Sequence, residues 1–378
     1  MRKIYIGVTI ILFLYLGTNI YIGKKIFYFL QLLYPHINGT IYTVIHACLA
    51  LSIVIAMIPF PNAIKNVFNW IGSHVMGIFV YLLLFFLLTD VIILLGSLLK
   101  IIPNPVPQSV HFFATLMVIL CTFSLVSYGI YHANQIQTVS YEVNINKPAA
   151  AGLKIVLISD LHLGAAHSET RLEKIVEKVN RQQPDLVCIA GDMFNNDYMA
   201  IQNPDRASAL FKQIKAKYGV YSSLGNHDAG GTFEHMLRFL ERSNIKLLND
   251  EHVIIDHRLA LFGRVDPSPI GNFGNIKRKD ISDQIAALDA NLPIIVMDHR
   301  PDQLDQYDEK TDLILSGHTH KGQLFPFNLV TKAIYTVDYG HYQKDPNSPH
   351  VIVTSGAGTW GMPMRVGTNC EVVTIQLK

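Results

Sequence analysis

Five short apolar runs in this sequence end in Asp, His or Asn, residue types that bind metal ions through oxygen and nitrogen. Each run has the length and composition of a buried β-strand. In open α/β sheets, ligands bind beyond the carboxyl ends of the strands. We therefore expect the five endings to surround a single site. They are Asp160-Leu161-His162, Gly191-Asp192, Gly225-Asn226-His227-Asp228, Asp298-His299 and Gly317-His318-Thr319-His320.

This ligand set predicts a metal centre with two ions. Imidazole together with carboxylate suits Zn, Fe and Mn, whereas Ca²⁺ prefers oxygen ligands alone. The candidates outnumber the four ligands of a tetrahedral ion, but two divalent ions about 3.5–4 Å apart that share a carboxylate would use them all. Such a pair polarises a phosphoryl oxygen and lowers the pKa of a bridging water. Glycines before Asp192, Asn226 and His318 would let the backbone turn sharply enough to point these side chains inward.

Each motif also has an ordinary structural explanation. A single D-x-H is common by chance, and Gly-Asp after a strand is usual turn chemistry. GNHD and GHTH are more specific, and all five motifs in this order at strand ends favour the metal centre. The other histidines of this part of the chain follow no such pattern, and we interpret them as surface or locally hydrogen-bonded residues. They are His167, His235, His252, His257, His341 and His350.

The elements that position these endings follow an α/β pattern from residue 154 onward. Parallel-type buried strands are expected at 154–159, 185–190 and 220–224. Helices are expected at 169–183, 207–216 and 233–242. After Ile245 we expect antiparallel strands, at 252–256, 259–265, 293–297 and 313–315. Further strands are expected at 140–146, 351–355 and 371–377, and a linker at 147–152.

Composition divides the chain into two parts. Of its 378 residues, 50% are hydrophobic and only 16% are charged, which excludes a disordered chain. Residues 1–150 contain seven Lys and Arg and two Asp and Glu, whereas the rest contains 24 and 27. The first part therefore resembles a membrane segment and the second a soluble domain. The chain has no basic run that would indicate a nucleic-acid partner. Its four Cys include no CxxC pair that would indicate a zinc or disulfide framework.

Four stretches of the first part are long and apolar enough to cross a bilayer, which needs about 20 residues. They lie at 4–22, 41–60, 71–102 and 109–133. We therefore expect a four-helix transmembrane anchor at 1–135, a linker at 136–153 and a catalytic domain at 154–378. The three later spans argue against a cleaved signal peptide in the first. The segment 26–34 is too short to cross and is expected to lie in the membrane interface.

Four spans would place both ends of the anchor on one side of the membrane. That side carries Arg2, Lys3, Lys65 and Lys147, and the other carries Lys24, Lys25 and Lys100. The first side has one more Lys or Arg than the other, and cytoplasmic loops carry the excess of these residues. This predicts a cytoplasmic catalytic domain in a multi-pass membrane protein. Asp90 stands alone in its apolar run, either as part of an ion path, as a residue near a helix end, or as a residue that hydrogen-bonds a neighbouring helix. A lone intramembrane charge argues against a transporter or receptor.

From residue 154 to the end, the sequence resembles the calcineurin-like metallophosphoesterase superfamily, through the ordered motifs D-x-H, GDxx(D/N), GNH(D/E), H and GHxH. SGHTHKGQ, HRPD and GAGTWGMPMRVG make it similar to the membrane-associated bacterial branch with the YkuE and YaeI proteins. The resemblance implies two mixed β-sheets packed face to face between helices. Relatives usually have GHTHGGQ, so Lys321 is a departure, expected either to meet an anionic substrate or to point to solvent.

The resemblance also implies a role for each motif residue. The first ion would be held by Asp160, His162, His320 and Asp192. The second would be held by Asn226, His299, His318 and, again, Asp192. His227 would act on the leaving group, Asp228 would orient His227 through a hydrogen bond, and Asn195 would support the site. The cofactors would be two divalent ions, Mn, Fe or Zn.

These expectations describe a membrane-anchored hydrolase that cleaves a phosphate ester through attack of a metal-bridging hydroxide. The anchor favours a substrate at the bilayer, either lipid-linked or part of the cell envelope. The loop 356–367, which carries Trp360, is either the rim of the pocket or an ordinary glycine-rich connection. The alternatives are a non-catalytic metal-binding scaffold and a membrane receptor. Complete retention of the ligand positions argues against the scaffold.

Overall fold

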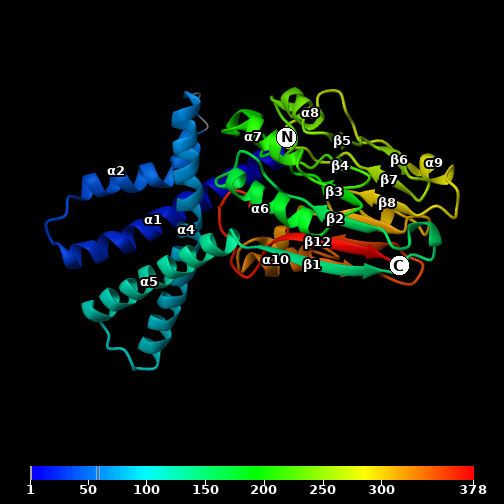
Figure 1. The fold of residues 1–378 in the computed structure, drawn as a ribbon. Helices are drawn as coiled ribbons and strands as arrows, with labels where there is room; N and C mark the ends of the chain where they lie inside the picture. Colours follow the sequence, from blue (N-terminus) through cyan, green and yellow to red (C-terminus); the bar gives the residue numbers. More distant parts are fainter. Residues whose placement is uncertain (1, 57, 59) are drawn as a thin grey trace. The chain divides into compact units, whose positions relative to one another are not determined.

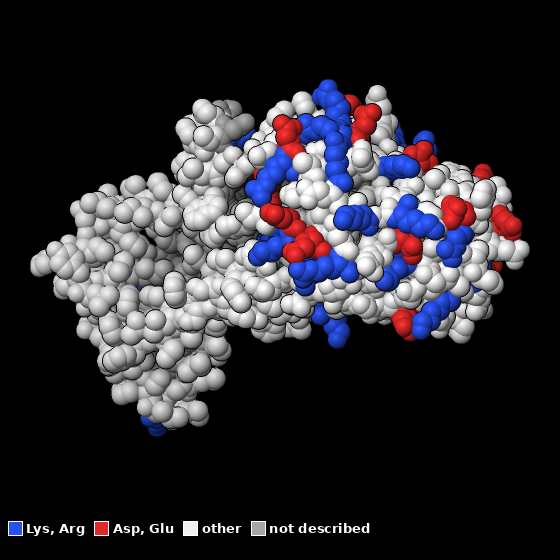
Figure 2. Space-filling model, in the orientation of Figure 1, with Lys and Arg blue, Asp and Glu red and all other residues white. Residues whose placement is uncertain are grey.

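The computed structural model describes every residue except 1, 57 and 59 (Figure 1). The side chains of residues 2–8, 10, 11 and 62 also lie outside the description. The chain divides into two compact units, Met1–Gly129 and Ile130–Lys378. Figure 2 shows that, on the face drawn, charged side chains are gathered over the α/β unit and are nearly missing from the helical unit.

The first unit is built from helices. They are α1 (Arg2–Leu33), α2 (Gly39–Ala50), α3 (Ser52–Ala56), α4 (Asn62–Leu98) and α5 (Gln108–Ala133), the last of which continues into the second unit. Among the described residues, Ala63–Leu98 and Gln108–Ala133 are long and apolar enough to cross a membrane, with mean hydropathies of 2.9 and 2.0. A small core joins α1, α4 and α5 through Ile22, Phe86 and Val118.

Of the other two expected spans, 4–22 lies within α1 and partly on side chains outside the description, whereas 41–60 differs from the sequence interpretation. The stretch 41–60 is divided into α2 and α3, and the 12 residues of α2 rise only about 18 Å. The segment 26–34, expected as a separate interfacial piece, is mostly part of α1, which continues past Lys24 and Lys25 to Leu33.

Asp90 bonds to a neighbouring helix, as one alternative expected, but it also has a charged partner, contrary to the sequence interpretation. Lys25 Nζ lies 2.5 Å from one carboxylate oxygen, and Tyr21 donates a hydrogen bond of 2.6 Å to the other. Two residues of α1 therefore hold the carboxylate of α4. Charged residues within membrane helices usually pair in this way. The trio links two helices, which favours a structural role for Asp90.

The second unit contains two six-stranded sheets, each with parallel and antiparallel neighbours. The first has the order β1-β12-β2-β3-β4-β5 and the second β10-β11-β9-β8-β7-β6. The first-sheet strands are β1 (Ile136–Val143), β2 (Lys154–Ile158), β3 (Leu186–Ala190), β4 (Val220–Ser223), β5 (Ile245–Leu247) and β12 (Cys370–Leu377). The second-sheet strands are β6 (Glu251–Ile255), β7 (Leu259–Gly263), β8 (Ile294–Met297), β9 (Leu313–Ser316), β10 (Gly340–Tyr342) and β11 (His350–Val353).

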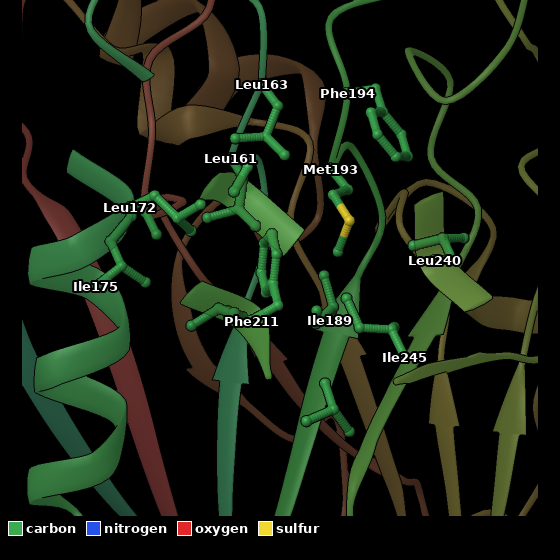
Figure 3. Close-up of a cluster of buried hydrophobic side chains, with 14 of the residues drawn as sticks. Leu161, Leu163, Leu172, Ile175, Ile189, Met193, Phe194, Phe211, Leu240 and Ile245 are labelled. Atoms are coloured by element: carbon green, nitrogen blue, oxygen red, sulfur yellow. The ribbon is translucent and has the colours of Figure 1, made fainter. Parts of the chain in front are cut away.

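The two sheets pack face to face because their central strands are apolar on both sides. Ile155 and Leu157 of β2 pack in one core with Ile295 and Met297 of β8, between the sheets. The outer face of the first sheet carries a second core under α6 (Ser168–Arg181), α7 (Pro204–Phe211) and α8 (Phe233–Arg242). Side chains from these helices and from the strands converge there in Figure 3. A third core with α9 (Ser282–Ala286) covers the outer face of the second sheet.

Two features of the sheets were not expected. Residues 136–153, taken as a linker with a strand at 140–146, contain β1, which begins earlier, at Ile136. It pairs along its length with β12 in parallel, so only two residues separate the first sheet from α5. Of the four strands from 252 to 315 that were expected to be antiparallel, only β6 and β7 pair in that way. The pairs β7–β8 and β8–β9 are parallel, so the expected antiparallel arrangement is wrong there. Parallel pairing sends the carboxyl ends of these strands to one edge.

Candidate metal centre

The centre lies where the carboxyl ends of five strands meet. In the first sheet, β2, β3 and β4 end shortly before Asp160, Asp192 and Asn226. In the second sheet, β8 and β9 end shortly before His299 and His318. Because β2 to β4 are parallel to one another, as are β8 and β9, each sheet delivers its polar endings to a single edge. The sequence prediction that these endings converge agrees with this arrangement.

Two groups of side chains at this edge could each hold a metal ion. One consists of Asp160, His162 and His320, and the other of Asp192, His299 and His318, and the ligand atoms of each group lie within 4.8 Å of one another. In the first group, His162 Nε2 lies 3.1 Å from His320 Nε2. His320 Nε2 is also 3.3 Å from Asp160 Oδ1. Three potential ligand atoms therefore face a common point.

Asp192 lies between the two groups. Its Oδ2 is 3.2 Å from Nε2 of His299 and 3.8 Å from Nε2 of His162. Its Oδ1 accepts a hydrogen bond of 2.8 Å from the backbone N–H of His227, which fixes the carboxylate. Asn226 joins the second group, because its Oδ1 lies 3.0 Å from Nδ1 of His318. Asp192 is thus within reach of both groups.

The buried polar atoms fit a pair of cations. His299 donates from Nδ1 to the carbonyl oxygen of Ala190 at 2.8 Å, which leaves the lone pair of Nε2 directed into the centre. Nε2 is buried and without a hydrogen-bond partner among the described residues. A buried polar atom in this state costs about 1–3 kcal/mol unless something binds it. Nitrogen and carboxylate oxygen donors in this number suit Mn, Fe or Zn.

The electrostatics keep most of these ligands in the form that binds metal. Burial lowers the pKa of His162 and of His318 to about 3, so both rings are neutral near pH 7. Burial and the charge of Arg365 hold the pKa of His320 well below its ordinary value. Burial opposes ionisation of Asp192, but the close approach of His299, 3.2 Å away, holds its pKa far below the usual range, so the carboxylate is ionised.

The backbone at the ligands is held in a conformation that residues other than glycine rarely adopt. Asp160, His162, Asp192, His318 and His320 all have φ between 48° and 72°. Each such position costs on the order of 1 kcal/mol or more and persists only where the surroundings enforce it. Strain of this kind is concentrated at functional sites.

At two of the motif glycines, a neighbouring residue lies too close for any side chain, although the backbone φ is ordinary. A Cβ on Gly225 would lie 2.3 Å from both the backbone nitrogen and Oδ1 of Asp192. A Cβ on Gly317 would lie 2.0 Å from the hydroxyl of Ser159. Gly191, in contrast, has φ of 77° and permits the sharp turn that the sequence predicted.

His227 is oriented by Asn196 and not by Asp228. The ring nitrogen Nδ1 of His227 donates a hydrogen bond to Oδ1 of Asn196. Asp228 instead accepts from the backbone N–H groups of Phe194 at 2.9 Å and Gly225 at 2.8 Å, so it joins the two loops. The expected Asp228–His227 hydrogen bond is therefore wrong, and Asn196 was missed because the motif pointed to its neighbour Asn195.

Arg365 is a second residue that the sequence interpretation left without a role. Its side chain is fully buried and donates from Nη1 to the carbonyl oxygen of His320 at 2.9 Å. Nη2 donates to the carbonyl oxygens of Ser355 and Gly358 at 2.7 and 2.6 Å. One guanidinium thus fixes the GHTH loop to the glycine-rich loop 356–367. A buried arginine is seldom visible in a sequence, because arginines are mostly exposed.

Other motif residues have structural contacts. Asp298, which precedes His299, accepts hydrogen bonds from Arg278 at 2.7 Å and from Tyr307 at 2.6 Å. The ammonium group of Lys321 lies 4.0 Å from the centre of the Tyr339 ring, a cation–π contact. Trp360 is half exposed, and its ring centre is 5.8 Å from that of His227. The loop 356–367 therefore lies beside the centre.

Comparison with known proteins agrees with this geometry. The family model for calcineurin-like phosphoesterases matches residues 153–322. A transmembrane protein with metallophosphoesterase domain from Danio rerio is 30% identical over 320 residues, covering 80% of this chain and 72% of that protein. An uncharacterized metallophosphoesterase of Helicobacter pylori is 31% identical over 231 residues, 60% of either chain. The uncharacterized metallophosphoesterase YkoQ of Bacillus subtilis is 29% identical, covering 64% of this chain and 90% of its own length.

This chain therefore belongs to the calcineurin-like phosphoesterase family, and its homologues include transmembrane proteins with a metallophosphoesterase domain. It spans about 60% of the length of the Helicobacter relatives.

Proposed function

We propose that this chain is a membrane-anchored, metal-dependent phosphoesterase that hydrolyses a phosphate ester at the centre formed by its two ligand groups. The observation that carries the proposal is the position of Asp192, whose Oδ2 lies 3.2 Å from His299 and 3.8 Å from His162. A carboxylate within reach of two ligand groups is the arrangement that a pair of divalent ions needs.

The proposed ligand sets follow the two groups and share Asp192. Asp160, His162 and His320 would hold one ion. His299 and His318, with Asn226 beside them, would hold the other. When bound, two such ions polarise the phosphoryl oxygens and lower the pKa of a coordinated water toward neutrality. The strained backbone and the neutral imidazoles of His162, His318 and His320 support this assignment, because the chain keeps these side chains ready to coordinate.

His227 is the residue we propose for proton movement at the leaving oxygen. Its Nδ1–H group donates a hydrogen bond to Asn196. The other ring nitrogen, Nε2, is therefore the one that can accept or release a proton. Its ring lies 5.0 Å from the ring of His162, beside the first ligand group. In this proposal Asn196 orients His227, while Asp228 fixes the loops that carry Asp192 and Asn226.

The helical unit is proposed to anchor the enzyme in a membrane. Helices α4 and α5 support this most strongly, because each contains a span of sufficient length. That α1 and the α2–α3 pair complete a four-span anchor, and that the catalytic unit faces the cytoplasm, stay predictions from the sequence. An enzyme anchored in this way would meet phosphoesters at the bilayer, lipid-linked or in the cell envelope.

The proposal is tested by turnover of the full-length protein in detergent with Mn²⁺, using nitrophenyl phosphate and bis-nitrophenyl phosphate. Asp192→Ala removes the shared carboxylate and should lower turnover at least about hundredfold, because the ions supply several kcal/mol and each 1.36 kcal/mol is a factor of ten. Asp283→Ala deletes an exposed carboxylate on α9 and should leave turnover unchanged. Equal turnover in the two variants would contradict the proposal.

A further inference from the structure

Helix α10 (Phe327–Ile334) presents its apolar side chains to the outside of the α/β unit. Phe327, Val330 and Ile334 lie at helical spacing on one face and are 41%, 51% and 69% exposed. Leu329 adds a side chain that is 58% exposed, and Phe325, just before the helix, is 48% exposed. These five residues are called here the α10 apolar face.

The polar edge of α10 is the part that contacts the rest of the unit. Thr331 donates a hydrogen bond of 2.8 Å to the carboxylate of Asp338. The backbone at Asn328 lies so close to Gly322 that a Cβ there would be 2.3 Å from the nitrogen of Asn328. A surface helix of a soluble domain normally turns its apolar stripe toward the core. In α10 this arrangement is reversed, and an exposed apolar cluster of this kind marks an interaction surface.

We propose that the α10 apolar face inserts into the surface of the bilayer that holds the apolar helices of the same chain. The chain leaves α5 at Ala133 and enters β1 at Ile136, so the catalytic unit is tied closely to a membrane helix. Tyr128 and Tyr131, near the end of α5, are 50% and 67% exposed. Aromatic side chains of this kind are enriched at the membrane–water interface.

The chemistry of the helix fits a lipid surface. Helices that lie in the interface combine large apolar residues on one face with Lys or Arg at the polar edge. Lys332 is the exposed cation of α10 and would lie near lipid phosphate groups. The occupant is therefore a bilayer, since the α/β unit that carries α10 begins at the end of α5, a helix long and apolar enough to cross a membrane.

Insertion of α10 would place the metal centre near the lipid headgroups, an inference that rests on the proposed function. Asp338, which accepts from Thr331 of α10, also accepts through its backbone carbonyl from the hydroxyl of Thr319 at 2.6 Å. Thr319 lies between His318 and His320. Two hydrogen bonds through Asp338 thus connect α10 to the loop that carries the proposed ligands His318 and His320. The corresponding substrate class is a phosphoester carried by a lipid at the bilayer surface.

The test uses the full-length chain in phosphatidylcholine–phosphatidylglycerol vesicles, with Cys48 and Cys121 replaced by Ser. Cys188 and Cys370 are buried and are kept. Val330→Cys or Ile334→Cys carries an environment-sensitive fluorophore, and a label at Asp283→Cys, an exposed position of α9, is the matched control. In Figure 1, α9 and α10 lie at opposite ends of the α/β unit. Lipids with a quencher just below the headgroups should quench the labels at 330 and 334 at least about threefold more than the label at 283.

A charged variant of the α10 apolar face provides the second measurement. With the label at position 329, the double substitution Val330→Glu and Ile334→Glu should lower quenching to the level of position 283. Equal quenching at 283, 330 and 334 would overturn the inference. A label whose emission is shifted to the blue but is not quenched by the lipids would also overturn it, because a protein surface would then cover the helix. Quenching is read without turnover, so failure of the proposed function and failure of this inference give different results.

Discussion

Asn196 is predicted to position His227, and its removal should slow the reaction by a limited and calculable factor. The Asn196→Ala change deletes the acceptor of the His227 Nδ1–H hydrogen bond. A neutral hydrogen bond contributes about 0.5–1.5 kcal/mol net. Since 1.36 kcal/mol corresponds to a factor of ten, turnover should fall about 2- to 13-fold. The loss of turnover in Asn196→Ala cannot exceed the whole contribution of a general acid, which is about 10²–10⁴-fold. His227→Ala should show that full loss.

The assay compares two substrates that differ in their leaving groups. Phenyl phosphate releases a more basic oxygen than nitrophenyl phosphate and depends more on proton donation. If Asn196 acts through His227, Asn196→Ala should therefore reduce turnover of phenyl phosphate more than that of nitrophenyl phosphate. A merely structural loss would reduce both equally.

Two further variants make the prediction specific. Asn196→Asp keeps an acceptor oxygen and should retain most of the turnover. Asn195→Ala alters the neighbour that the family resemblance favoured and should change turnover less than about twofold. Metal content and thermal midpoint are measured for each variant. The reasoning would be refuted if Asn195→Ala cost as much as Asn196→Ala, or if Asn196→Ala were fully active on both substrates.

Three other predictions follow from particular contacts. Gly225→Ala should abolish metal retention and turnover, since its Cβ would lie 2.3 Å from Asp192, whereas Gly231→Ala, whose Cβ meets nothing within 4 Å, should be neutral in both assays. Arg365→Ala removes three hydrogen bonds to backbone carbonyl oxygens and should destabilise the α/β unit by about 3–5 kcal/mol, seen as a lower thermal midpoint; an unchanged midpoint would contradict the assigned contacts. Asp90→Asn should lower the thermal midpoint in detergent by loss of the Lys25 ion pair without changing turnover, and a loss of turnover with an unchanged midpoint would instead indicate a functional role for Asp90.

The sequence was sufficient to predict the strand endings that meet at the candidate metal centre. Each of these strands is a short, continuous apolar run, a pattern that a strand buried on both faces must have. The polar residues after each run, such as Asp160 after β2 and His299 after β8, could therefore be assigned to a common edge. Parallel pairing of β8 with β9 was missed, because an apolar run alone does not reveal the direction of its neighbour.

Residues that act through other residues were harder to predict. Asn196 and Asn195 are adjacent and chemically identical, and only the backbone of the loop decides which one reaches His227. Arg365 lies in a loop far along the chain from His320, and the hydrogen bond between them depends on the tertiary fold. The pairing of Asp90 with Lys25 was missed for the same reason, since α1 and α4 meet only in three dimensions.

The most direct test of the central claim is the metal content of the purified full-length protein after equilibration with Mn²⁺ and removal of free ion. The two ligand groups predict two ions per chain in the unaltered protein. His162→Ala and His299→Ala, which alter different groups, should each retain about one ion and lose turnover. A fully active protein with a single ion, or a variant that keeps two ions and full turnover, would contradict the two-ion centre.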